Sequence, residues 1–188
     1  MNFNERYSAG PTLPRFFREW KQQMADLGNS VTHFTPVNYL NQPEGPPFII
    51  AAQWLFCPRF IEYRDCAILT KGPQEDPGGF DTWFDHLNGD LSRVEGKVNL
   101  VNISDLFTAS MMEPETEPDD EDLSQLAGTL AQCWHALLRQ QFPDRRFEVF
   151  VMDDETTNGP EVSFFTIRPG EEERFTVTEG VTVRYRDL

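Results

Sequence analysis

One apolar stripe between residues 123 and 138 constrains the fold of this chain more than any other feature. Its large side chains recur at the three- and four-residue spacing of a single helix face: Leu123, Leu126, Ala127, Leu130, Trp134, Leu137 and Leu138. A helix with so broad an apolar face needs another layer of structure to cover it. We therefore expect a helix that reaches about Gln141 and packs inside a folded domain.

An acidic segment leads directly into this helix. Seven of the ten residues in the range 113–122 are acidic and none is basic. Two prolines exclude regular helix from its first half, so we expect an extended, solvated loop at about 105–118. Asp119 or Asp120 then caps the helix, where its dipole favours negative charge. The acids left without such a structural reason are Glu113, Glu115 and Glu117.

Two further helices are predicted from the same apolar spacing. The first covers residues 12–27, with Thr12 as its N-cap and Gly28 just after its last turn. The second is short and covers residues 80–87.

Apolar runs and alternating patterns predict strands in the rest of the chain. The segments concerned are 47–58 and 59–71, joined at Cys57-Pro58-Arg59; 96–107; 146–153 and 161–169, around Asn158-Gly159; and 174–187, which turns at Glu179-Gly180. Segments 146–153 and 161–169 are typical of one antiparallel hairpin, and segment 174–187 is typical of a second. Segment 47–58 is apolar enough for a strand covered on both faces.

This succession of helices and strands predicts an α+β fold. We expect a single domain, residues 1–188, with helices packed on one face of a mainly antiparallel sheet. A hydrophobic content of 39% with 13% aromatic residues is enough to build its core.

The net charge of −15 limits the classes of partner, and it has two open interpretations: it keeps the protein soluble, or it attracts a basic protein. It repels nucleic-acid phosphates and anionic membrane surfaces, and no Lys/Arg stripe offsets it. Neither a secretory signal nor a membrane-spanning segment is visible, so we expect a cytoplasmic protein. The three cysteines, Cys57, Cys66 and Cys133, are expected to be reduced, buried thiols.

The sequence lacks the motifs of common enzyme classes. No paired Cys and His ligands for zinc, no phosphate-binding glycine loop, no dinucleotide-binding glycine pattern and no Gly-x-Ser-x-Gly turn are present. We therefore predict no cofactor and no metal site.

One cluster, Asp81, Asp85 and His86, resembles a catalytic site. The two aspartates are four residues apart on a predicted helix, so a hard metal ion or acid–base chemistry could use them with the neighbouring imidazole. The simpler interpretation places them on the wet side of that helix. Asp65 shares strand parity with Ile61 and Tyr63, which points it inward unless the strand register breaks there.

We favour a non-catalytic binding protein, of the inhibitor or immunity type, whose acidic surface docks a basic protein partner. The residues assigned to that surface are Glu113, Glu115, Glu117, Asp119 and Asp120. Two alternatives remain open. The first is a small metal-dependent or acid–base enzyme that uses Asp81, Asp85 and His86, and the second is a structural or assembly component. The sequence does not fix the oligomeric state.

Overall fold

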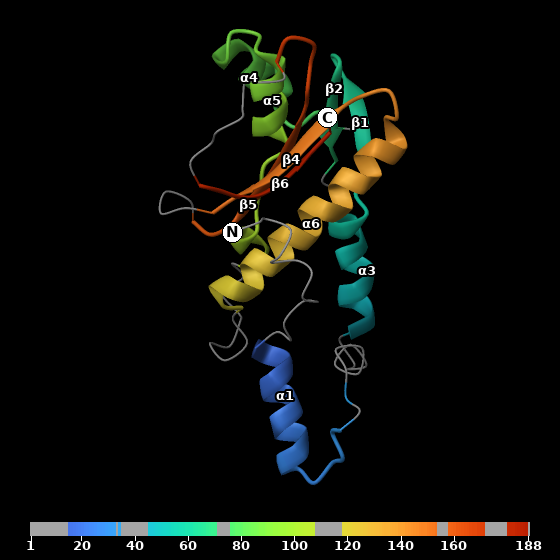
Figure 1. Cartoon of the computed structure of the whole chain (residues 1–188), viewed down its shortest axis with the longest axis vertical. Coiled ribbons are helices and arrows are strands. Elements are labelled where there is room, and N and C mark those ends of the chain that lie inside the picture. Colours follow the sequence, from blue (N-terminus) through green and yellow to red (C-terminus); the bar gives the residue numbers. More distant parts are fainter. Residues whose placement is uncertain are drawn as a thin grey trace.

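Two antiparallel sheets, with α-helices packed on them, make up the α+β fold of the computed structural model (Figure 1). The structure describes residues 15–32, 34, 45–70, 76–107, 118–153, 158–171 and 180–187. In chain order the elements are α1 (Arg15–Asp26), α3 (Gly45–Phe56), β1 (Phe60–Tyr63), β2 (Cys66–Leu69), α4 (Phe80–His86), α5 (Leu91–Val98), β3 (Val101–Asn102), the 3-10 helix η2 (Ser104–Leu106), α6 (Asp120–Gln141), β4 (Phe147–Met152), β5 (Glu161–Thr166) and β6 (Val181–Arg186).

The larger sheet has the strand order β3-β5-β4-β6, and α6 lies across one of its faces (Figure 1). Phe147, Val149 and Val151 alternate along β4 and are buried in the same core as the apolar stripe of α6. Trp134 on α6 is fully buried and packs edge-on against Phe164 of β5, with 6.1 Å between the rings. The predicted long helix and the β4–β5 hairpin are both confirmed.

The opposite face of this sheet is partly covered by α5. Helix and strand meet closely there, because the Ser163 hydroxyl of β5 donates a hydrogen bond to the carbonyl oxygen of Gly96. A second apolar cluster, which includes Phe80, Val94 and Val98, joins α5 to α4 and to β2. The sequence predicted helices on one face of the sheet; α6 takes that place, and α5 adds a partial cover on the other.

The smaller sheet is a hairpin of β1 and β2 that the sequence did not reveal. Residues 59–71 were predicted as one strand, which is wrong, because the chain reverses at Arg64 and Asp65. Both residues have positive φ, 47° and 65°, as in the tightest class of hairpin turn. Asp65 is therefore at an exposed turn and does not point into the core.

The prediction of a strand over residues 47–58 is also wrong, because most of that segment forms α3. A continuous apolar run does not distinguish a buried strand from a helix, and twelve residues is a helix length. Pro46 and Pro47 fall in the first turn of α3, where a backbone N–H is not needed. Several large apolar side chains of α3 remain exposed: Ile49, Ile50 and Trp54.

A third strand prediction, over residues 96–107, is largely wrong. Helix α5 extends to Val98, and only Val101 and Asn102 form a strand before η2 begins. The start signal of α5 is Asp90, whose carboxylate accepts a hydrogen bond from the backbone N–H of Arg93 at 3.2 Å.

The remaining predicted elements agree with the structure where it describes them. Helix α1 ends as expected, with Gly28 at a φ of +81° after its last turn, and α4 is the predicted short helix. The predicted cap Thr12 and the first arm of the last hairpin lie outside the described residues, and β6 pairs with β4. Among the described helices, none is both long and apolar enough to span a membrane.

Candidate functional site

The three residues of the predicted catalytic cluster all lie on α4, and no hydrogen bond or ion pair joins any two of them. Asp81 forms an ion pair with Arg64 at 3.2 Å, and the Tyr63 hydroxyl lies 3.3 Å from both of its carboxylate oxygens. Asp85 and His86 are exposed on α4. In the part of the chain that the structure describes, no three His, Cys, Asp or Glu side chains are placed to hold a metal ion.

The predicted partner-binding acids are described only in part. Asp119 is the N-cap of α6, because its carboxylate accepts a hydrogen bond from the backbone N–H of Asp122 at 2.9 Å. Asp120 follows it and is exposed. The three loop acids, Glu113, Glu115 and Glu117, lie outside the described residues.

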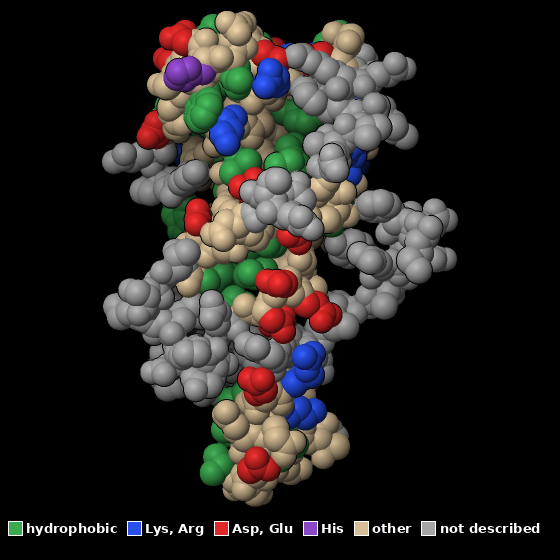
Figure 2. Space-filling view, turned by 90° about the vertical axis from the view of Figure 1, so that its left-hand side faces the viewer, with side chains coloured by type: hydrophobic (Ala, Val, Ile, Leu, Met, Phe, Trp, Pro, Cys, Tyr) green, Lys and Arg blue, Asp and Glu red, His purple; other side chains and the backbone are tan. Residues whose placement is uncertain are grey.

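A fifth acid joins this end of α6 from a distant part of the chain. Asp153 follows β4, and it accepts a hydrogen bond from the Ser124 hydroxyl in the first turns of α6 at 2.9 Å. We call the group at this end the α6 acidic patch. It consists of Asp119, Asp120, Glu121, Asp122 and Asp153. Figure 2 shows a group of acidic side chains about midway along the molecule.

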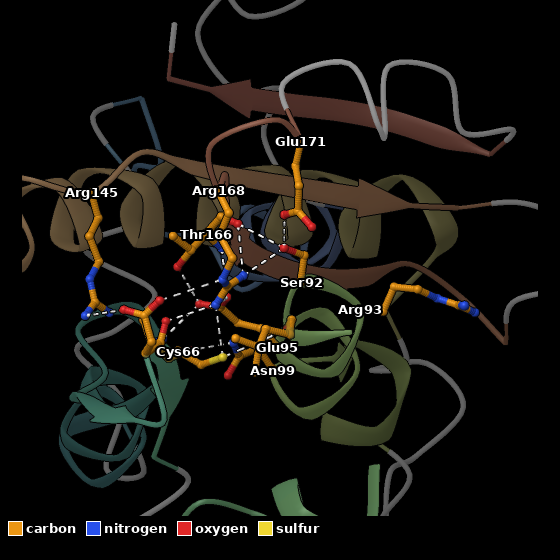
Figure 3. Close-up of polar contacts among 12 residues, drawn as sticks. Cys66, Ser92, Arg93, Glu95, Asn99, Arg145, Thr166, Arg168 and Glu171 are labelled. Atoms are coloured by element: carbon orange, nitrogen blue, oxygen red, sulfur yellow. Dashed lines mark hydrogen bonds and ion pairs between the residues drawn. The ribbon is translucent and has the colours of Figure 1, made fainter. Parts of the chain in front are cut away.

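A buried polar network connects the two sheets (Figure 3). Its centre is Glu95 on α5, whose side chain is fully buried. One carboxylate oxygen accepts hydrogen bonds from the N–H of Ala67 at 2.9 Å and the Thr166 hydroxyl at 2.8 Å. The other accepts from the N–H of Thr166 at 3.0 Å and lies 3.1 Å from Nη2 of Arg168.

Arg168 extends this network toward the turn of the small hairpin. Its guanidinium donates to the Ser92 hydroxyl at 2.7 Å and to the carbonyl oxygen of Asp65 at 2.9 Å. Ser92 in turn donates a short hydrogen bond to Glu171. Every oxygen of the central carboxylate thus has donors, so the network holds β2, α5 and the end of β5 together.

Cys66 lies in this network but is not a reactive thiol. Burial, reinforced by the nearby Glu95 carboxylate, raises its pKa to about 12. Burial likewise raises the pKa of Glu95 above its ordinary value, and Arg168 opposes that rise. All three cysteines are free, but Cys57 is exposed and Cys133 only half-buried, so the prediction of three buried thiols holds for Cys66 alone.

A second buried carboxylate lies on the sheet face that α5 partly covers. Glu148 on β4 is 1% exposed and faces two arginines of the neighbouring strand β6. Nε of Arg184 lies 3.1 Å from one of its oxygens, and Nε of Arg186 lies 3.3 Å from the other. Burial raises the pKa of Glu148, against the opposing effect of both arginines.

An open cavity of about 590 Å³ lies over this face, between the sheet and helices α4 and α5. Its apolar lining consists of Trp83, Leu87, Gly96, Leu100, Phe150, Met152 and Phe165. Its polar lining consists of Ser92, Arg93, Lys97, Glu148, Glu161 and Arg184. The size and the mixture of apolar walls with a few charged groups are typical of small-molecule sites.

Two features of the sequence point to these buried carboxylates. Glu95 occupies an apolar-face position of α5, together with Leu91, Val94 and Val98, and a carboxylate there needs buried partners. Glu148 alternates with the core residues of β4, opposite two arginines of β6. Both patterns become visible only when α5 and the β4–β6 pairing are known.

Comparison of the chain with protein-family models, curated proteins and solved structures gave no match. Its function is therefore argued from its own residues.

Proposed function

We propose that this chain is a non-catalytic binding protein that docks a basic protein partner on its α6 acidic patch. The observation that carries the proposal is the meeting of Asp153 with the four acids at the start of α6, which gathers charge from two distant segments. Such a patch steers a positively charged partner into contact and favours it over acidic competitors.

The proposal agrees with the overall charge of the molecule. A net charge of −15 gives the whole surface an attractive field for a basic partner, and the patch concentrates it at one end. Only part of the patch has a local structural role, because Asp119 is the capping residue of α6. Asp120 and Glu121 are exposed on the first turn of α6.

The reactive-looking side chains of the described residues support binding over catalysis. The Cys66 thiol is buried with a raised pKa, and the Asp81 carboxylate is engaged by Arg64 and Tyr63. An inhibitor or immunity-type role in the cytoplasm suits a protein of this kind, where its three free thiols stay reduced.

A pair of charge-matched variants tests the proposal. The variant Asp120→Asn with Glu121→Gln removes two exposed charges from the patch. The variant Asp26→Asn with Asp85→Asn removes two exposed charges from α1 and α4. Each protein is immobilised and used to capture proteins from the native host at about 50 mM and about 500 mM salt, because screening weakens exposed charge contacts.

We expect the wild type and the α1/α4 variant to retain a basic protein at low salt, and the patch variant to bind it about tenfold more weakly, as the loss of two exposed charge contacts allows. The captured protein should be released at high salt. Retention at high salt, or equal binding by the two variants, would show that the patch is not the docking surface.

A further inference from the structure

The cavity between α4, α5 and the larger sheet combines aromatic walls with positive charge. Trp83 comes from α4, and Phe150 and Phe165 come from neighbouring strands, with their rings 6.0 Å apart. These flat side chains give the cavity apolar walls that can hold a flat apolar group.

Two cations, Arg93 and Lys97, lie one helical turn apart on α5 and line the same cavity. Figure 3 shows the Arg93 side chain directed away from the buried network. Within the described part of the chain, neither cation forms an ion pair with an acid. Lys97 instead places its ammonium group 5.4 Å from the centre of the Trp83 ring, where an aromatic face attracts a cation.

The acids of the cavity cancel this charge only in part, because its described lining has three cations and two acids. Glu148 lies between Arg184 and Arg186, so its negative charge is already compensated from β6. Glu161 is the first residue of β5 and is the other acid among the described lining residues. Positive charge at a cavity is notable in a chain with almost twice as many acids as bases, 31 against 16.

We propose that this cavity is a binding site for a small organic anion with a flat apolar body. Arg93 and Lys97 bind its acidic group, and Trp83, Phe150 and Phe165 contact its body. Charge-assisted contacts fix the orientation, and burial of the apolar body supplies affinity. The site is separate from the proposed docking of a basic protein, because cations, and not the α6 acidic patch, recognise this ligand.

A pair of fluorescent probes separates the contributions of charge and apolar body. The anionic probe is 8-anilinonaphthalene-1-sulfonate, and the neutral probe is N-phenyl-1-naphthylamine, which has the same ring system without the sulfonate. Both are titrated into the full-length protein and into two double variants. Arg93→Gln with Lys97→Gln removes the cavity cations, and Arg18→Gln with Lys21→Gln removes two cations of α1 as a charge-matched control.

The wild type should bind the sulfonate more tightly than the neutral probe. In the cavity variant we expect the sulfonate to bind about tenfold more weakly, because charged hydrogen bonds are lost. The affinity for the neutral probe should not change. The α1 variant should match the wild type. Arg93 and Lys97 are exposed, so the variants are expected to fold, and circular dichroism confirms it.

Amide chemical shifts locate the bound sulfonate. Shifts at Gly96, Phe150 and the Trp83 indole support the cavity. Shifts confined to Ile50 and Trp54 would place the probe on the exposed apolar side chains of α3 and overturn the proposal. Failure of the wild type to bind the sulfonate, or equal binding by the wild type and the cavity variant, would also overturn it.

Discussion

Glu95 shows how a single buried carboxylate can organise a small protein. A charged group removed from water is costly unless donors surround it. Here two backbone N–H groups, one hydroxyl and one guanidinium supply those donors. The side chain therefore has a structural role, although Cys66 and Ser92, which contact its partner Arg168, are residue types that catalyse reactions elsewhere.

Replacing Glu95 tests this interpretation. Glu95→Ala removes the acceptor of the N–H groups of Ala67 and Thr166 and the buried charge that pairs with Arg168. We expect the free energy of unfolding to fall by about 3–5 kcal/mol, the cost of breaking a buried ion pair from one side. Urea denaturation measures it. Asp85→Ala, at an exposed carboxylate on α4, serves as the control and should change stability by less than about 0.5 kcal/mol.

Glu148 makes the free energy of unfolding depend on pH in the opposite sense to a carboxylate whose pKa is lowered by folding. Its pKa is raised in the folded protein from the ordinary value of 4.5, so the folded state binds the proton more tightly than the unfolded state. The stability that this group contributes is complete below the unfolded pKa. It is lost as the pH rises through the folded pKa.

The comparison with Glu148→Gln isolates this effect, because the glutamine side chain does not titrate. We expect the stability of the wild type relative to the variant to fall as the pH rises from about 4.5 to about 7.5. Urea denaturation at several pH values measures the difference. A wild type that gains on the variant over this range would mean that Arg184 and Arg186 lower the pKa more than burial raises it.

At the scale of elements, the sequence predicted the helix and the strands whose apolar pattern repeats over many residues. The apolar stripe of α6 spans many residues, and the alternating strands β4 and β5 are joined by an Asn-Gly turn signal. The start of α6 was also predictable, because Asp119 precedes an apolar stripe and is a strong capping residue.

The wrongly predicted elements are those whose local sequence does not indicate the structure that they form in the folded protein. The sequence of α3 is apolar on all sides, so it shows no helical period. In α5, valines and Gly96 weaken the helical propensity, and packing against β5 overrides it. The turn of the small hairpin uses Arg64 and Asp65 where glycine or asparagine would signal it. The buried network and the cavity depend on these elements and could not be predicted without them.

A substitution at Gly96 tests whether this residue weakens the helical propensity of α5. It has ordinary helical backbone geometry, and a Cβ added there would meet the Phe165 ring at 4.0 Å, an ordinary contact distance. Gly96→Ala should therefore raise the free energy of unfolding by about 0.5–1 kcal/mol. Gly89→Ala is the matched control, and we expect it to change the stability in the opposite direction. Gly89 has a φ of +76°, and an added Cβ would lie 3.3 Å from the Phe84 ring, so the free energy of unfolding should fall by about 1–2 kcal/mol. Thermal unfolding of both variants measures the contrast.

At the scale of the whole molecule, the two proposed sites differ in charge. Figure 2 shows Lys and Arg side chains over α4 and α5 at the upper end and a group of acidic side chains about midway along the molecule, although both kinds of charge also occur elsewhere on this face. The acidic patch suits a basic macromolecule, whereas the cations beside the cavity suit a small anion. The net charge alone, which the sequence shows at once, predicts only the first of these.

The contacts of α5 with β2 have one more consequence, which concerns self-association. The N–H groups of Ala67 and Leu69 and the carbonyl oxygen of Ala67 bond to side chains of Glu95 and Asn99 on α5. These groups belong to the strand edge that β1 leaves open, the kind of edge on which other chains can add strands and start aggregation. The side chains of Glu95 and Asn99 thus make the hydrogen bonds that a further strand would make with this edge. They protect a four-residue edge from intermolecular pairing without lengthening the sheet.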